Sequence, residues 1–481
     1  MAARRSVPGW AVGLSIFGTY VSSISFLALP SKAFSGDWNA FVFSLSLPLA
    51  AWISVRYFVP FYRASKSLSS YEHLERRFGP WARTYALACY LLTQWARSGT
   101  IMYLLALALA SLTGWSVPAL ILTTGIVVII YTLYGGITAV IWTDVVQSGV
   151  FMVGAVTCAV VLVAHIPGGP SHLLAFSAEH HKFSLGTFDP GLRQSTFWVV
   201  LLYGLTINLQ NFGIDQNYVQ RYQTARSDPD ARRSIWLGAL LYVPISAVFF
   251  LIGTGLFTFY AANPGRLPAA TAASADTIFP YFIVHELPPG LVGLVVAALF
   301  AAAQSTISTE INSSATLILC DVYRRYVRPQ ASEAQSLFVL RVASLGVGLA
   351  GTGMALAMMR IKSALDAWWL LAGIFGGGML GLFLLGRLSS RARSADALAG
   401  VGAGVVVILW MTFSPGWPDA LATFRSPFNS NLIIVFGTLT VLGVGWLTAR
   451  RQPSRGLPAG AASGPPTPKH SRRSWLRTGQ P

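Results

Sequence analysis

A run of oxygen-bearing side chains interrupts an apolar stretch of the sequence between residues 301 and 316. Several of them recur at helical spacing, so they share about one face of a helix. The run consists of Ser305, Thr306, Ser308, Thr309, Asn312, Ser313 and Ser314. Polar groups at bilayer depth are unfavourable unless they face protein or a solute path, and oxygen atoms are the ligands of hard cations such as sodium. The alternative is that these hydroxyls only join neighbouring helices.

A single arginine, Arg97, lies inside another apolar stretch, in the segment QWARSG of residues 94–99. A charge without a partner at membrane depth is expensive, so such a residue is functional by default. The planar guanidinium can hold a carboxylate through two parallel hydrogen bonds. The alternative is a structural pair with a carboxylate or with helix carbonyls of the protein itself.

The composition indicates a membrane protein. Of the 481 residues, 54% are hydrophobic and 11% are charged, whereas a soluble domain has roughly 25% charged residues. The net charge of +17 does not indicate a nucleic-acid partner, because the basic residues lie between apolar stretches and near the C-terminus instead of forming one stripe. The three cysteines lie in or at the ends of apolar segments, which favours neither a disulfide framework nor a metal site.

Residues 1–449 are predicted to form an all-α membrane domain of twelve spans, each long enough or nearly long enough to cross about 30 Å of hydrocarbon. The predicted spans are Trp10–Leu29, Phe41–Val59, Tyr85–Leu112, Pro118–Leu133, Val145–Ile166, Phe197–Ile214, Ile235–Tyr260, Val292–Ile318, Leu337–Met359, Ala364–Leu385, Ala397–Phe413 and Leu432–Trp446.

The basic residues predict how these spans are oriented. If the N-terminus is cytoplasmic, most of the 34 Lys and Arg residues fall on the cytoplasmic side. We therefore expect a multi-pass membrane protein with both termini on the cytoplasmic side. The first span shows no cleavage site and should remain as a helix. Residues 450–481 are predicted to be a disordered basic tail that can contact lipid headgroups.

Two of the predicted spans carry glycine and polar side chains at membrane depth. Residues 18–25 read GTYVSSIS, and residues 208–213 read NLQNFG. Broken helices at matching places in two halves are a sequence indication of a transporter site, and five spans separate these two, as a five-plus-five repeat requires. Chance interruption is the alternative, because other spans also contain polar residues.

Three long motifs then resemble the signature of the sodium:solute symporter family. They are YGGITAVIWTDVVQ at residues 134–147, DQNYVQR at residues 215–221, and residues 305–323 with NS in the middle and CDVY at the end. Within this family, residues 13–38 and 196–221 are most similar to the bacterial sodium-coupled sialic acid transporters. The resemblance implies a leucine-transporter-type fold, with two inverted five-helix repeats over about residues 9–386 and two further helices over about residues 395–449.

The resemblance also implies two sodium ions as the co-transported species. The first would bind the backbone of Gly18, Val21 and Ala302 and the hydroxyls of Ser305 and Thr306. The second would bind the carboxylate of Asp144 and the hydroxyls of Ser305, Thr306, Ser308 and Thr309. From the sequence alone, Asp144 could equally be a carboxylate favoured by the dipole at the start of a helix.

For the substrate, the resemblance matches Ser22 and Ser25 to hydroxyls that hold the carboxylate of sialic acid, next to Arg97. Further candidate contacts are Tyr20, Ser44, Asn208 and Asn211. The chain departs from the sugar-transporting relatives at Tyr20, Ala40 and Ser44 and lacks their acidic and amide contacts on the second span. The carboxylate end of the site is thus kept, while the polyol end is altered. Many relatives also have an extra helix before the first core helix, so either this branch lacks it or the start codon is placed too far downstream.

Together these features predict a secondary active transporter that imports an organic anion with sodium by alternating access, with sialic acid as the favoured substrate. The alternatives within transport are another carboxylate, such as a monocarboxylate or a vitamin acid, or a sugar. A membrane sensor that binds a solute and a passive channel remain as other classes. No nucleophile and base pattern occurs, so an enzyme is not expected. Neither affinity nor oligomeric state follows from the sequence.

Overall fold

The computed structural model describes residues 6–65, 68–133 and 137–450. Across these ranges the chain is helical, and its only strand-like pairing is a single bridge between Val7 and Ala225. Three of the Lys and Arg residues counted on the cytoplasmic side, Arg4, Arg5 and Lys66, lie outside the described residues, as do residues 134–136 of the first motif and the predicted tail from residue 451 onward.

Each of the twelve predicted spans corresponds to a helix or to a bent pair of helices. Among the described residues, nine helices are long and apolar enough to cross a membrane, two bent pairs add two spans, and Val117–Ile130 is a shorter apolar helix. The bent pairs turn by 57° in the first span and by 41° in the tenth. Most helices extend beyond the predicted ends, because polar residues at the ends of a span continue the helix outside the apolar stretch.

The first five spans begin with the bent pair. They are α1 (Gly9–Tyr20) with η1 (Ile24–Ala28) and α2 (Leu29–Ser35); the segment from α3 (Val42–Leu45) through α4 (Leu47–Ile53) and η3 (Ser54–Phe58) to α5 (Val59–Ala64); α7 (Pro80–Thr113); α8 (Val117–Thr132); and α9 (Ile137–His165). Between the second and third spans lies α6 (Glu72–Phe78), and after the fifth lies α10 (Gly169–Glu179).

The next five spans are α11 (Phe197–Ile214), α13 (Asp228–Ala262), α16 (Pro289–Leu317) continued by η5 (Ile318–Val327), α17 (Glu333–Ala357), and α18 (Ala364–Gly376) with α19 (Met379–Leu388). Short helices α12 (Gln216–Thr224), α14 (Ala269–Ala272) and α15 (Ala275–His285) lie between them, and α20 (Ser394–Phe413) and α21 (Ile433–Arg450) complete the chain's described part.

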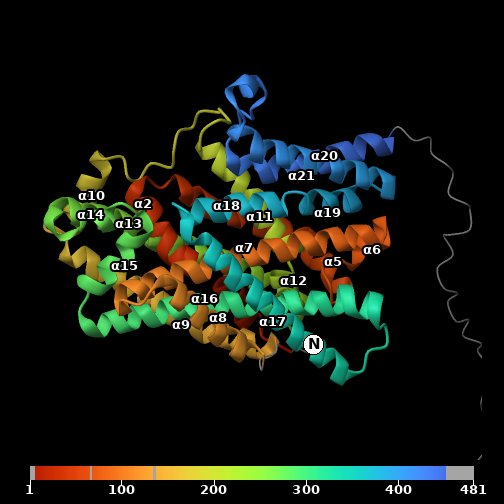
Figure 1. Ribbon diagram of the computed structural model, residues 1–481, viewed down its shortest axis with the longest axis horizontal. Helices are drawn as coiled ribbons and strands as arrows, with labels where there is room; N and C mark the ends of the chain where they lie inside the picture. The colour runs from red at the N-terminus through yellow and green to blue at the C-terminus, as the bar shows by residue number, and fades with distance from the viewer. Residues whose placement is uncertain (1–5, 66–67, 134–136, 451–481) are drawn as a thin grey trace, which may run out of the picture.

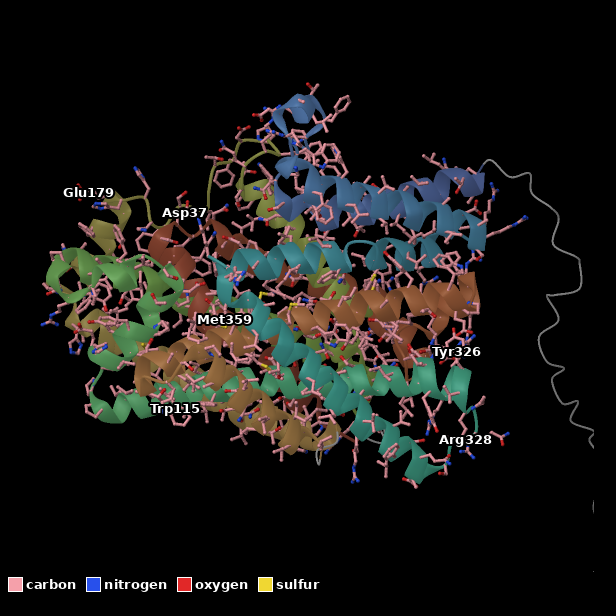
Figure 2. The ribbon with its side chains drawn as sticks, viewed as in Figure 1. Asp37, Trp115, Glu179, Tyr326, Arg328 and Met359 are labelled. Atoms are coloured by element: carbon pink, nitrogen blue, oxygen red, sulfur yellow. The ribbon has the colours of Figure 1, made fainter. Side chains whose placement is uncertain are left out.

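The broken first span lies in the interior of the bundle. Helix α1 packs against α13, α9 and α16, and α16 in turn packs against α9, α7 and α17. Helices α20 and α21 pack on each other and lie along one edge of the molecule beside α19 (Figure 1). In Figure 2, Asp37 and Glu179 lie toward one end of the long axis, and Tyr326 and Arg328 lie toward the other. The segments that follow the first and fifth spans thus lie toward the opposite end of the molecule from the segment that follows the eighth span.

The first span breaks where its sequence is richest in hydroxyls. Helix α1 ends at Tyr20, and Val21 adopts an extended conformation with ψ of 120°. Ser22 then accepts a hydrogen bond from the backbone amide of Ile24 at 3.2 Å, which replaces a bond that the helix no longer supplies. The predicted break in this span is therefore present, and it leaves backbone carbonyls of α1 available to other groups.

The sixth span breaks later than predicted. Helix α11 runs without interruption through residues 208–213 and ends at Ile214, and Asp215 is the extended residue. The Asp215 carboxylate accepts a hydrogen bond from the amide of Asn217 at 2.7 Å and so caps α12. The prediction placed the break at residues 208–213 because they are polar, but the Asn208 side chain is satisfied by Ser46 and Tyr20 and does not require unwinding.

The close approach of α20 and α21 depends on glycines. A Cβ atom added to Gly400 would lie 2.5 Å from the carbonyl oxygen of Val441, whereas one added to Gly402 on the same helix would meet nothing within 4 Å. Small residues at such positions allow membrane helices to pack tightly.

We therefore expect Gly400→Ala to destabilise the packed α20 and α21 pair by about 1 to 3 kcal/mol through overpacking. The measurement is the apparent melting temperature of the purified protein in detergent. Gly402→Ala is the matched control and should leave the melting temperature unchanged or raise it. Equal effects of the two variants would show that the glycine contact does not limit the packing.

Candidate functional site

A cavity of about 830 Å³, counting the space at its opening, lies beside the break in the first span. Polar and aromatic side chains from six segments line it, among them Tyr242 of α13, which makes it suitable for a polar solute with some apolar surface. The lining includes Tyr20, Ser22 and Ser25 from the first span, Ser44 from the second, Gln94 and Arg97 from α7, Asn211, Asp215 and Tyr218 around the second break, and Trp368 and Trp369 from α18.

Six of the seven predicted substrate residues line this cavity. They are Tyr20, Ser22, Ser25, Ser44, Arg97 and Asn211. The seventh, Asn208, instead accepts a hydrogen bond from the Tyr20 hydroxyl at 3.2 Å and donates one to the Ser46 hydroxyl at 2.9 Å. Asn208 therefore contacts a lining residue, and its direct contact with a substrate is a prediction that this geometry does not favour.

The serine hydroxyls that line the cavity already have hydrogen-bond partners, at different distances. Ser44 shares a hydrogen bond of 2.7 Å with Ser246. Ser22 is the acceptor that follows the break, and Ser25 lies 3.5 Å from the hydroxyl of Tyr242. Ser25 is thus held more loosely than Ser44. Ala40, which also lines the cavity, offers no polar side-chain atom, so the second span supplies few free polar groups.

Arg97 is buried, with 8% of its surface exposed. It contacts both a helix carbonyl and a carboxylate of the protein itself, which are the two contacts expected if its role were structural. Its Nη2 donates to the backbone carbonyl of Thr19 at 2.5 Å, close to the break in α1. Its Nε lies 3.2 Å from Oε1 of Glu310. Arg97 also lines the cavity, so these contacts hold the guanidinium at the cavity wall.

Glu310 was not among the predicted site residues. It lies on α16 among the predicted sodium ligands, is fully buried, and also accepts a hydrogen bond from the hydroxyl of Ser98. The criterion that selected Arg97, an ionisable residue inside an apolar span, would have selected Glu310 as well. Glu310 lies within the run of hydroxyl side chains that was interpreted as an ion site.

The predicted first sodium ligands lie together where α1 breaks. The Thr306 hydroxyl lies 3.5 Å from the carbonyl oxygen of Val21 and 3.2 Å from that of Ala302. A Cβ atom on Gly18 would lie 3.4 Å from the Ser305 hydroxyl, so α1 and α16 meet at this point. The site gathers backbone carbonyls and hydroxyls without a carboxylate of its own, which is the kind of ligand set that unwound membrane helices provide for sodium.

Of the predicted second sodium ligands, Asp144 forms a buried ion pair with Arg221, and the hydroxyls of Ser305 and Thr309 contact this pair. Asp144 Oδ2 accepts hydrogen bonds from Arg221 Nη2 at 2.9 Å and from Ser15 Oγ at 2.6 Å, and Oδ1 accepts one from Ser305 Oγ at 2.5 Å. Both charged side chains are completely buried. Asp144 lies about two turns inside α9, so it is not the carboxylate at the start of a helix that the sequence left open.

Arg221 joins four segments around this pair. Besides Asp144 it donates to Thr309 Oγ1 at 2.5 Å, to Ser15 Oγ at 2.7 Å and to the carbonyl of Asn217 at 2.8 Å. Of the other predicted ligands, Ser308 donates to the Ser305 carbonyl of its own helix at 3.2 Å. Arg221 lies within the DQNYVQR motif and was counted from the sequence as a basic residue of a cytoplasmic segment, whereas it is completely buried against Asp144, which lies 77 positions away in the sequence.

Asp215 is a further charged residue that lines the cavity and was not among the predicted site residues. Its carboxylate accepts a hydrogen bond from Gln94 at 3.2 Å, and Gln94 in turn accepts one from Asn217 at 3.1 Å. This chain of polar groups joins α7 to the break between α11 and α12 at the cavity wall. The signal was available, because a capping aspartate after an apolar helix indicates a helix start.

Comparison with known proteins identifies the family of this chain. Residues 1–404 match the model of the sodium:solute symporter family. The sodium/sialic acid symporter of Proteus mirabilis is 35% identical over 90% of this chain and 87% of its own length. The sodium/sialic acid symporter of Aliivibrio fischeri is 34% identical over 93% and 86%, and the sodium-dependent multivitamin transporter of Oryctolagus cuniculus is 32% identical over 85% and 65%.

Solved structures confirm the predicted fold. A Na⁺-coupled sialic acid symporter in a substrate-bound, outward-open state superposes with a TM-score of 0.84 at 33% identity, covering 93% of this chain and 91% of that one. Mhp1, a nucleobase-cation symporter at 17% identity, superposes with a TM-score of 0.60 over 94% and 93%. The fold is the leucine-transporter type, with about twelve spans. The chain belongs to the sodium:solute symporter family.

Proposed function

We propose that this protein imports a sialic acid, N-acetylneuraminate or a close analogue, together with sodium, and that it does so by alternating access around the cavity beside the broken first span. The observation that carries this proposal is the position of Arg97. A guanidinium fixed at the wall of a polar cavity, close to the sodium ligands of α1 and α16, couples a carboxylate site to an ion site. The two relatives named as sodium/sialic acid symporters, which match over most of their length, support the substrate class.

The substrate would bind with its carboxylate toward Arg97, Ser22 and Ser25. These three side chains line the same cavity, and an arginine together with hydroxyls can provide charge-assisted hydrogen bonds to a carboxylate. The glycerol and acetamido groups would face Asn211, Gln94 and Asp215, which supply both donors and acceptors. We further propose that both termini are cytoplasmic and that the membrane is the bacterial inner membrane.

The first sodium ion would bind the carbonyls of Val21 and Ala302 and the hydroxyls of Ser305 and Thr306, with Gly18 alongside. Because Val21 belongs to the break and Thr306 to α16, an ion at this point holds the two segments together. The same break carries Ser22 and Ser25, so the ion and the substrate would stabilise one local conformation of the first span. This shared element is the physical basis of coupling, since each ligand favours the state that binds the other.

The second sodium ion would bind at Asp144 with the hydroxyls of α16, including Ser308 and Thr309. Arg221 already supplies a positive charge to Asp144. The ion can therefore bind only as the contact between Arg221 and Asp144 loosens, because two cations would otherwise share one buried carboxylate. We infer that occupation of the second site depends on a movement of α12 relative to α9.

The proposed function is tested by thermal stabilisation of the purified protein with a panel of sialic acids, sugars, monocarboxylates and vitamin acids, with and without sodium. We expect N-acetylneuraminate to raise the melting temperature only in the presence of sodium. A monocarboxylate or vitamin acid that stabilises the protein while N-acetylneuraminate does not would replace the proposed substrate.

Thr306→Ala tests the first sodium site. The substitution removes a ligand oxygen, so uptake should fall and the sodium concentration for half-maximal uptake should rise by about tenfold, corresponding to roughly 1.4 kcal/mol. Uptake is measured in proteoliposomes over a range of sodium concentrations. Thr132→Ala is the control, because that hydroxyl bonds only to the Val128 carbonyl of its own helix among the contacts of the described residues. An unchanged sodium requirement in Thr306→Ala would remove Thr306 from the site.

Arg97→Lys tests the carboxylate contact. Lysine keeps the positive charge but loses the planar pair of donors, so a carboxylate substrate should bind about tenfold or more weakly, on the order of 1.5 to 3 kcal/mol. Binding is measured by calorimetry in saturating sodium. Arg266→Lys provides the control, since Arg266 pairs with Glu286 on the exposed surface. Equal affinity in wild type and Arg97→Lys would leave Arg97 with a purely structural role.

The number of sodium ions is tested at the buried pair. Asp144→Asn alone strands the charge of Arg221, which costs about 3 to 5 kcal/mol, so the double variant Asp144→Asn with Arg221→Gln is the better probe. Wild type should carry two sodium ions per monoanion with a net inward current, and the double variant should carry one with no current. Flux ratios of labelled sodium to substrate in voltage-clamped proteoliposomes measure this. One sodium per anion in wild type would exclude the second ion.

A further inference from the structure

We propose that Glu310 is an internal counter-ion for Arg97, which neutralises the guanidinium while the cavity holds no substrate and yields this role to the substrate carboxylate. This inference rests on the proposed carboxylate contact of Arg97. Glu310 would then be a specificity-determining residue. It would also set how fast the empty transporter changes from its inward-facing to its outward-facing state.

The geometry gives Glu310 one strong and one weak attachment. Its Oε2 accepts a hydrogen bond from the Ser98 hydroxyl on α7. Its Oε1 lies 3.2 Å from Arg97 Nε but has no hydrogen-bond partner in the described part of the chain. The contact between Glu310 and Arg97 is therefore held by charge more than by directed bonding, so a competing carboxylate with better geometry can replace it.

Because both side chains are buried, the balance of their charges has a large effect on stability and on anion binding. Glu310 is completely buried, and Arg97 is 8% exposed. A single buried charge is strongly destabilising, whereas an opposite pair is tolerated. In the empty cavity the pair is neutral. When an anion binds, one guanidinium faces two carboxylates, and the repulsion between Glu310 and the substrate weakens binding.

The nearby Asp215 is less suited to this role. Its two carboxylate oxygens are engaged by the amide of Asn217 and by the side chain of Gln94, so hydrogen bonds within the cap already disperse its charge. The other buried ion pair beside α16, Asp144 of α9 with Arg221 of α12, is also self-contained, because each charge neutralises the other. Glu310 is therefore the carboxylate whose charge is directed at Arg97.

The inference has a kinetic consequence for the transport cycle. Net uptake requires the empty transporter to return, whereas exchange of internal for external substrate does not. Without Glu310, the empty state with the cavity closed would bury the Arg97 guanidinium without its ion-pair partner. Removal of the Glu310 charge should thus favour substrate binding and slow the empty return.

The experiment compares Glu310→Gln with wild type in proteoliposomes, using labelled N-acetylneuraminate and saturating sodium. We expect the KM of Glu310→Gln to fall by about threefold or more, because the competing charge is gone. We expect its net uptake rate to fall while the rate of exchange against internal substrate stays near that of wild type. Glu286→Gln is the matched control, since it removes a carboxylate that pairs with Arg266 away from the cavity.

A KM that is unchanged or higher in Glu310→Gln, with net uptake and exchange slowed together, would overturn the inference and leave Glu310 as a structural support for Arg97. If Glu310→Gln does not fold, as judged by its melting temperature, Glu310→Ser removes the same charge and carries the same expectation. Glu310→Asp keeps the charge and should retain the wild-type ratio of net uptake to exchange. Wild type that transports no N-acetylneuraminate would instead contradict the proposed function, and the counter-ion inference would fall with it.

Discussion

The break in the first span is the constraint on which the rest of the site depends. A hydrocarbon environment offers no water to unsatisfied backbone groups, so a transmembrane helix can unwind only where protein or a polar cavity satisfies the freed carbonyls and amides. The extended residue Val21 requires such partners. Thr306 faces its carbonyl, Arg97 bonds to the carbonyl of Thr19, and Ser22 satisfies the amide of Ile24.

The polar groups that satisfy the break are also the groups that bind ligands in the proposed function. The hydroxyl face of α16 meets α1 from one side, and Arg97 on α7 meets it from another. A change in the local conformation of the first span would therefore alter the ion site and the cavity at the same time. This common element gives coupling between sodium and substrate a specific physical location instead of a diffuse path through the bundle.

Two buried ion pairs flank the break, and both involve the neighbourhood of α16. Arg221 with Asp144 connects the second broken span to α9, and Arg97 with Glu310 connects α7 to α16. Each pair balances its charge locally, which a low-dielectric interior requires. In the proposed function, sodium would compete with Arg221 for Asp144, and a substrate carboxylate would compete with Glu310 for Arg97, so both pairs would respond to ligand binding.

The sequence determined the twelve spans, the break in the first one and the oxygen-rich face of α16, because hydrophobicity, helical periodicity and local polarity are properties of neighbouring residues. It also selected Arg97 as a buried charge. The tertiary structure decided which charges meet: Glu310 as the partner of Arg97, Arg221 as the partner of Asp144, and Asp215 as the position of the second break. These outcomes depend on which helices pack side by side, and no periodic pattern within one helix records its neighbour.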